Sequence, residues 1–289
     1  MGLTTKGRIP QFQGNLRAVV PTPTFSGRLT DNPADSINPN TGSGPGTGGS
    51  GVTFAEIAGT GSTDPFFDDV ELLVNGEGSV ADSSGNPAAF TVTSNIALDT
   101  VTFQEGLSSL RFSENGIAEI ADDGRFQVGT DSYTIEAWVY PRSNPPASGS
   151  NRAQVIFQKE HSANIGTVFW GLQLRNGPGA PLCFAYFGPS GSTSVALSSG
   201  STLALNTWHH VAAVRDGNNY TLYINGVQAA TDTSAHVHAA QNTPASIGGR
   251  AAQHGATRFF ANANIDAVRF TNGVRYNGNF TPPTEFPTS

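Results

Sequence analysis

The sequence predicts an all-β fold, a jelly-roll sandwich of two antiparallel sheets, from three observations. From residue 66 onward, short apolar segments follow one another, each ended by a cluster of Gly, Pro, Ser or Asn residues. None of these segments shows helical periodicity. The 289-residue chain contains 34 Gly and 18 Pro, and only 13% of its residues are charged. Many short strands without helices bury their apolar faces best as two packed sheets.

The clearest element is a hairpin in residues 208–227, which read WHHVAAVRDGNNYTLYINGV. Residues 208–215 form the first predicted strand and residues 220–224 the second, joined by the turn residues Asp-Gly-Asn-Asn. Asn225 and Gly226 then supply the residues that a type I′ turn requires. A hairpin of this kind is stable only when its apolar face packs on a larger sheet, so the chain must contain many further strands.

The other predicted strands are short, and each ends at a turn signal such as Asn75-Gly76. In chain order they are residues 70–74, 90–94, 109–112, 117–120, 133–140, 154–158, 169–174, 182–187, 194–197, 246–248 and 265–270. Cys183 is the one cysteine of the chain and falls inside a predicted strand, where we expect it to be a small buried apolar residue.

Residues 1–63 do not have the pattern of a domain, because Gly and Pro interrupt every candidate strand or helix and apolar residues are sparse. One interpretation is a leader without fixed structure, which is the default for this composition. We favour an extended anchoring arm with a flexible Gly-rich hinge at residues 41–50, followed by one domain at residues 64–289. The predicted contact residues of the arm are Arg8, Phe12, Arg17, Phe25 and Arg28.

Charge and hydropathy argue against several partners. The net charge of −7 disfavours nucleic acid, which requires a basic surface. No apolar run is long enough to insert into a membrane. The first residues, MGLTTKGRIP, contain no apolar core of a secretory signal peptide. We therefore expect synthesis in a reducing host cytoplasm and, for any exit from the cell, a route other than secretion.

Three segments carry a family resemblance: the hairpin, residues 133–141 (YTIEAWVYP) and residues 264–270 (NIDAVRF). Together they resemble laminin-G-like domains of the concanavalin-A-like lectin/glucanase superfamily, which implies a concanavalin-A-like jelly roll. Residues 64–74 and 274–283 are similar to versions of this domain in bacteriophage structural proteins. The likeness spans approximately residues 65–289.

The resemblance implies a non-catalytic virion structural protein of a bacteriophage, either a capsid decoration or a tail-associated surface protein. Capsid or tail proteins of the same virion would hold the arm, and the domain would be displayed outward as a homo-oligomer, for particle stabilisation, adhesion to host cell-surface glycans, or both. Two alternatives are a free or cell-surface carbohydrate-binding lectin module and a divergent glycanase.

Catalysis is not predicted. Glycoside hydrolysis needs two carboxylates on either side of the scissile bond. In the hydrolase branch of the superfamily these come from a Glu-x-Asp-x-x-Glu strand, which this sequence lacks. Glu136 has no acidic partner nearby in sequence, so we expect it to accept structural hydrogen bonds. A Gly-x-Ser-x-Gly elbow for a nucleophilic serine is also absent.

The resemblance further implies a structural calcium ion bound by Asp266, Asp82 and Glu77, because many relatives tie the closing strand to the start of the domain in this way. In the alternative interpretation, Asp266 accepts backbone hydrogen bonds and Asp82 caps a turn. His236 and His238 lie on one side of an extended segment, but two imidazoles are too few for a transition-metal site.

Sugar binding in this superfamily uses exposed aromatic rings, which stack on the pyranose. The candidate glycan-binding residues are Trp170, Arg175, Tyr186 and Tyr223, with the arginine placed to hydrogen-bond hydroxyl groups. The alternative for the tryptophans is the core, which we expect for Trp138 and Trp208 and leave open for Trp170.

Overall fold

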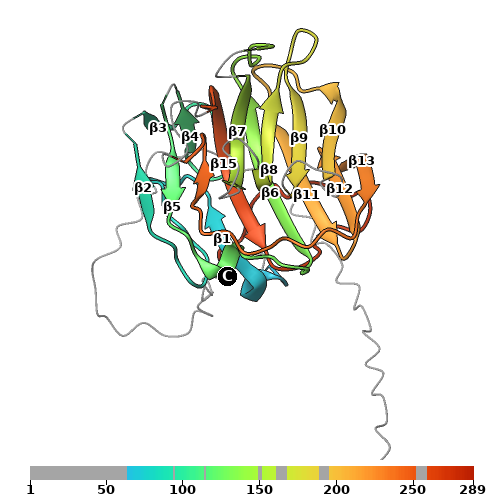
Figure 1. Ribbon diagram of the computed structural model, residues 1–289. Coiled ribbons are helices and arrows are strands. Elements are labelled where there is room, and N and C mark those ends of the chain that lie inside the picture. Colours follow the sequence, from blue (N-terminus) through green and yellow to red (C-terminus); the bar gives the residue numbers. More distant parts are fainter. Residues whose placement is uncertain are drawn as a thin grey trace, which may run out of the picture. The chain divides into compact units, whose positions relative to one another are not determined.

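The computed structural model describes residues 64–93, 95–113, 115–148, 152–160, 168–188, 195–251 and 259–289 (Figure 1). The predicted arm, with Arg8, Phe12, Arg17, Phe25 and Arg28, lies outside the described residues. Among the described residues, no helix has the length and apolar character needed to cross a membrane. Helical structure there is limited to two 3₁₀ turns, η1 (Phe67–Asp69) and η2 (Gly124–Phe126).

The described strands form two antiparallel sheets, which confirms the predicted sandwich. Sheet A has eight strands in the order β13-β12-β11-β6-β15-β4-β3, with β1 paired to β15. Its strands are β1 (Val70–Val74), β3 (Ile96–Asp99), β4 (Ser109–Phe112), β6 (Tyr133–Pro141), β11 (His209–Asp216), β12 (Asn219–Ile224), β13 (Val227–Thr233) and β15 (Ala263–Thr271).

Sheet B has seven strands in the order β10-β9-β8-β7-β14-β5-β2. Its strands are β2 (Phe90–Val92), β5 (Ala118–Ile120), β7 (Ala153–Glu160), β8 (Val168–Arg175), β9 (Leu182–Phe187), β10 (Val195–Thr202) and β14 (Ala245–Ile247). All predicted strands are present, and the structure adds β3 and β13, which the sequence pattern did not indicate.

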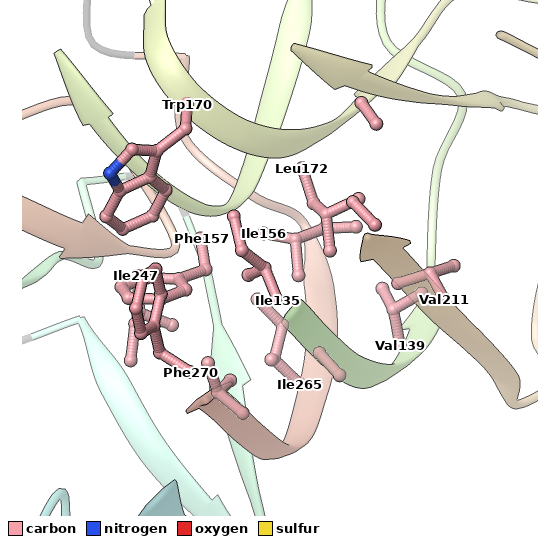
Figure 2. Close-up of a cluster of buried hydrophobic side chains, with 14 of the residues drawn as sticks. Ile135, Val139, Ile156, Phe157, Trp170, Leu172, Val211, Ile247, Ile265 and Phe270 are labelled. Carbon is pink, nitrogen blue, oxygen red and sulfur yellow. The ribbon is translucent and has the colours of Figure 1, made fainter. Parts of the chain in front are cut away.

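The core lies between the two sheets and takes alternate residues from each strand. In β6, the side chains of Tyr133, Ile135, Ala137 and Val139 belong to the core cluster, and the residues between them lie on the opposite face of sheet A. Figure 2 shows Ile135 and Val139 among Ile156, Leu172, Ile247 and other apolar residues from both sheets. Each fully buried side chain of this kind contributes about 1.5–3 kcal/mol to folding. We call the faces that point away from this core the outer faces.

The β12–β13 turn confirms the predicted type I′ geometry, since Asn225 and Gly226 have φ values of 51° and 75°. Gly226 is also required sterically, because a Cβ atom there would collide with the carbonyl oxygen of Phe280. The backbone N–H of Phe280 donates to the carbonyl of Gly226 at 2.9 Å. The turn therefore fixes the position of the C-terminal segment.

Residues 272–289, the C-terminal segment, cover the outer face of sheet A. Trp138 donates its indole N–H to the carbonyl of Pro283 at 3.2 Å. Trp138 is 8% exposed and packs with Phe286, and half-buried Trp208 packs against the same cluster. Trp138 is thus a core residue, as expected, although its cluster lies on the outer face of sheet A, whereas Trp208 is only partly buried against that cluster.

Candidate functional site

A network of buried charges lies on the outer face of sheet A, centred on Glu136 of β6. The Oε1 atom of Glu136 accepts from Nε and Nη2 of Arg269 at 2.9 and 2.8 Å. The Oε2 atom of Glu136 accepts from the Tyr276 hydroxyl at 2.6 Å and from Nε2 of His210 at 3.1 Å. Asp64 completes the network by accepting from Arg269 at 2.9 Å and from Arg275 at 2.8 Å.

Both carboxylate oxygens of Glu136 are engaged within the protein. Glu136 is 0% exposed. Burial alone would raise the pKa of Glu136, but the guanidinium of Arg269 and the hydrogen bond from His210 outweigh burial and hold that pKa well below its usual range. The Arg269 guanidinium also lies 3.9 Å from the ring centre of Phe286 in the C-terminal segment. Glu136 is therefore a structural hydrogen-bond acceptor, as the sequence suggested, and both of its oxygen atoms are occupied.

Two of the predicted sugar-stacking residues are covered by the protein itself, which corrects the sequence-based expectation. Trp170 is 0% exposed and lies in the core, with its ring centre 5.0 Å from that of Phe157 and 5.1 Å from that of Phe270. Tyr223 is 2% exposed and packs beneath Phe280 at 5.4 Å. Their positions in the interior and under the C-terminal segment leave neither ring free to stack on a sugar.

The three predicted calcium ligands do not form one set of donors. Asp82 accepts backbone N–H groups of Leu73, Ser84 and Ala88 at 2.7–3.0 Å, and Arg125 lies 3.5 Å away. Asp82 therefore caps a turn, in agreement with the alternative interpretation.

Glu77 and Asp266 bind the same loop through its backbone. Asp266 accepts from the N–H groups of Gln104 and Glu105 at 3.0 and 3.3 Å, and Glu77 accepts from that of Leu107 at 2.8 Å. Burial raises the pKa of Asp266 to about 6, although these backbone hydrogen bonds oppose the shift. Within the described part of the chain, no group of three or more His, Cys, Asp or Glu residues is placed to hold a metal ion. The residues present do not fit the predicted calcium site.

The other two predicted glycan-binding residues, Arg175 and Tyr186, lie together on the outer face of sheet B. They are half-buried, and the Arg175 guanidinium lies 5.4 Å from the ring centre of Tyr186. Phe184 stacks beside Tyr186, with 6.0 Å between ring centres and 16° between the ring planes. Burial raises the pKa of the Tyr186 phenol. A hollow of about 270 Å³, which we call the arginine groove, is lined by Ala147, Arg152, Arg175, Asn176, Phe184 and Tyr186.

Strand alternation explains why the groove residues meet. In β9, Cys183, Ala185 and Phe187 are core residues, so Phe184 and Tyr186 lie on the outer face. In β8, Leu172 and Leu174 are core residues and Arg175 follows at the end of the strand. Antiparallel pairing places Arg175 opposite Leu182 and Tyr186 opposite Gly171. Alternation thereby puts Arg175 and the two rings on one face of sheet B. The pairing sets Arg175 four positions from Tyr186 along the strands, and its long side chain brings the guanidinium to 5.4 Å from the Tyr186 ring centre.

Sequence reasoning missed Arg152 and Phe184 as members of this groove. Phe184 could have been found, because it lies two residues before Tyr186 and therefore on the same face of the strand. Arg152 could not, because β7 and β8 had to be paired before it could be placed. The amide of Asn176 donates to the carbonyl of Pro145 at 2.7 Å, so this side chain also positions the 144–148 loop.

A second hollow, of about 390 Å³, lies where β10 of sheet B approaches β12 and β13 of sheet A. Its wall includes His209, whose Nε2 atom lies 3.1 Å from the carbonyl of Ala204, and Asn225, which accepts the N–H of His210 at 2.9 Å. Because these polar groups already have partners within the protein, we consider the arginine groove the stronger candidate site.

The two-sheet sandwich and its aromatic outer face define a lectin-type β domain. The family model described as "Concanavalin A-like lectin/glucanases superfamily" matches residues 112–277, which is more than half of the chain. The protein therefore belongs to the concanavalin A-like lectin/glucanase superfamily. A comparison with curated protein sequences found no match.

Solved structures share the fold at low sequence identity. One is the binding domain of Paraclostridial Mosquitocidal Protein 1, with TM-score 0.54, 14% identity, and coverage of 72% of this chain and 49% of that chain. The botulinum neurotoxin serotype D binding domain gives TM-score 0.53 and 13% identity, with coverage of 75% and 49%. The chain thus spans about half of these toxin domains.

A third relative is similar over nearly its whole length. Domain 4 of the extracellular arabinanase AbnA from Geobacillus stearothermophilus, solved in complex with arabinotriose, gives TM-score 0.52 and 16% identity. The alignment covers 71% of this chain and 93% of that domain. At this level of identity, these likenesses establish the fold alone.

Proposed function

We propose that the protein is a non-catalytic glycan-binding domain of a bacteriophage virion structural protein, and that it binds sugar in the arginine groove. The observation that carries this proposal is the difference between the two outer faces. Sheet A is covered by the C-terminal segment, whereas sheet B presents the stacked rings of Phe184 and Tyr186 beside Arg175. Aromatic faces with a few adjacent polar groups are typical of ligand sites that fix the orientation of their ligand.

Relatives of the same fold support the carbohydrate part of the proposal. The arabinanase domain was solved with arabinotriose bound. A structure of a botulinum neurotoxin of type C, with TM-score 0.50, is described as requiring interaction with two ganglioside molecules for cell entry. Both are similar to this chain in fold, and we extend sugar binding from them to this chain as a proposal.

The carboxylates favour a binding function over hydrolysis. Glycoside hydrolysis uses two carboxyl groups that flank the scissile bond. Glu136 is fully engaged with Arg269, Tyr276 and His210 on the other sheet. The described lining of the arginine groove contains no carboxylate. This chemistry suits recognition of a sugar and offers no acid–base pair for its cleavage.

The virion setting rests on the sequence. The resemblance of residues 64–74 and 274–283 to bacteriophage structural proteins favours it, and residues 1–63 are the segment that we propose to attach to capsid or tail proteins. Many copies on one particle, or a homo-oligomer, would offset the weak affinity of a single groove through multivalency.

Glycan binding can be tested with the full chain on an immobilised panel of bacterial surface polysaccharides, followed by calorimetric titration of the glycans that bind. We expect Tyr186→Ala to abolish detectable binding, because it removes a stacking ring. Phe103→Ala is the matched control, since Phe103 is 38% exposed and does not line the groove. Absence of binding to every glycan, or equal loss in both variants, would refute a glycan site in the groove.

The attachment role needs the assembled particle. Deletion of residues 1–63 should abolish incorporation of the domain into virions while the remaining domain stays folded. Mass spectrometry of purified particles, with a density map of the particle, would measure this. A domain that binds glycans but is absent from every particle would favour the free lectin alternative.

A further inference from the structure

We infer that the arginine groove selects an acidic sugar, one that carries a carboxylate or a sulfate, through Arg152 and Arg175. This inference rests on the proposed glycan-binding function and specifies the class of sugar. It is drawn from the charges in the groove, from the aromatic surface beside them and from the size of the hollow.

The first argument is that the two arginines have no anionic partner among the described residues. Arg125, Arg142, Arg250, Arg269 and Arg275 each form an ion pair with an Asp or Glu residue. Among the described residues, neither Arg152 nor Arg175 forms such a pair, and the groove that both line contains no acidic side chain. The Nε atom of Arg175 is buried and has no hydrogen-bond acceptor in the described structure. A guanidinium that lines a hollow and has no carboxylate partner is well suited to bind a ligand anion.

The position of the two arginines in an acidic protein strengthens this argument. The chain has a net charge of −7, so its average surface repels an anionic glycan. A local pair of cations without described counter-charges favours binding of an anionic group at that place. Planar guanidinium groups also match the two oxygens of a carboxylate or sulfate in a bidentate geometry.

The second argument is the aromatic surface next to the cations. The stacked rings of Phe184 and Tyr186 provide an apolar face for the sugar ring, and Arg175 is held above Tyr186 and also lies 5.9 Å from the ring centre of Phe259. Because burial raises the pKa of Tyr186, its phenol stays neutral and adds no negative charge that would repel the ligand. An acidic sugar could stack on the rings while its anionic group contacts the arginines.

The third argument is size. The groove measures about 270 Å³. Pockets for drug-sized ligands range from about 300 to 1,000 Å³. The groove therefore suits a single acidic sugar at the end of a chain or on a branch, rather than a long stretch of polysaccharide.

The experiment uses three versions of one oligosaccharide that differ only in the terminal sugar, which is neutral, carboxylated or sulfated. The full chain is titrated with each by calorimetry. We expect the carboxylated or the sulfated version to bind about 10- to 100-fold more tightly than the neutral one, as for hydrogen bonds to a charged group. The version that binds more tightly identifies the anionic group, and the methyl ester of the carboxylated sugar should bind like the neutral one.

Two substitutions locate the selectivity. Arg175→Gln and Arg152→Gln should each lower the affinity for the acidic sugar by a larger factor than the affinity for the neutral sugar, and should therefore remove most of the preference. Arg111→Gln is the matched control, because Arg111 is an exposed arginine on β4 that does not line the groove. Thermal unfolding of each variant checks that it is folded, and the exposed Arg152 provides a second test if Arg175→Gln is unstable.

The outcomes separate the inference from the function on which it rests. Equal affinity for neutral and acidic versions, or a preference that survives both substitutions, overturns the acidic-sugar inference and leaves glycan binding intact. Failure to bind any of the three sugars, together with a negative panel of bacterial polysaccharides, overturns the proposed function itself.

Discussion

The two outer faces of the sandwich use the same residue types for opposite purposes. On sheet A, Arg269 and Arg275 lie beside aromatic rings and are neutralised by Glu136 and Asp64. On sheet B, Arg175 also lies beside aromatic rings, yet no described carboxylate neutralises it. An arginine–aromatic cluster is therefore a structural element where its charges are paired and covered, and a candidate recognition site where they are not.

The C-terminal segment causes the difference. Without it, the outer face of sheet A would expose Tyr223 and Trp138, which could serve as a sugar-stacking surface. Phe280 and Phe286 occupy that face instead, and the Tyr276 hydroxyl donates to Glu136. The C-terminal segment thus covers the outer face of sheet A, whereas part of the outer face of sheet B stays uncovered.

The largest expected effect on stability comes from disrupting the ion pairs on the outer face of sheet A. Glu136→Ala should destabilise the domain by about 3–5 kcal/mol, because it leaves Arg269 buried with only Asp64 to neutralise it. Urea unfolding at neutral pH measures the change, with Asp131→Asn as an exposed control that should shift stability by less than about 0.5 kcal/mol. A loss no greater than that of the control would show that the network does not hold the face together.

A second prediction uses the pH dependence of stability to distinguish the ion pairs on the outer face of sheet A from the arginine groove on sheet B. The pKa of Glu136 is depressed in the folded protein, so its ionised form contributes stability above the unfolded-state pKa of about 4.3. This contribution is lost as the pH falls below that value towards the folded pKa. Between about pH 5 and about pH 3, the stability of the wild type should therefore fall more steeply than the stability of Glu136→Gln.

The same acid titration on Arg175→Gln serves as the comparison, because Arg175 has no described carboxylate partner. Its stability profile should run parallel to that of the wild type. Urea unfolding at each pH gives both profiles, and parallel curves for wild type and Glu136→Gln would contradict the assignment of acid sensitivity to sheet A.

The smallest expected effect concerns calcium. Asp82, Glu77 and Asp266 already accept backbone N–H groups, so we expect addition of calcium or of a chelator to leave the melting temperature unchanged. Asp266→Asn should lower it in either condition, because the change weakens the hydrogen bonds to Gln104 and Glu105. A rise in melting temperature with calcium that Asp266→Asn removes would restore the calcium site that the family resemblance implied.

Strand positions were predictable because alternation and turn residues are local signals. Residues 70–74, 109–112 and 182–187 are predicted with the bounds that the structure has. The missed strand β13 reads VQAATDT and is mostly exposed, so it lacks the apolar alternation that marks a strand. β13 is a strand because it pairs with β12, and its own sequence does not indicate this.

The site was less predictable, because alternation does not say which face of a strand is covered. In β9, both faces carry apolar residues, so Phe184 and Tyr186 cannot be told apart from core residues by pattern alone. Tyr223 lies on the outer face of β12 but is covered by residues 272–289, a segment without strands in the structure and without a periodic signal. Trp170 follows core residue Phe169 directly and is itself a core residue, a break in alternation that only the three-dimensional packing reveals.

Asp64 has a mechanical consequence, because the preceding 63 residues join the domain there. Its carboxylate is bound to Arg269 of β15, a strand flanked by β6 and β4, and to Arg275. Tension applied along the chain ahead of residue 64 would therefore reach β15 by two routes, through these ion pairs and through β1, which pairs with β15 alone. A pull on Asp64 would thus act on a strand that β6 and β4 hold from both sides, and not on the free edge of the sheet at β3.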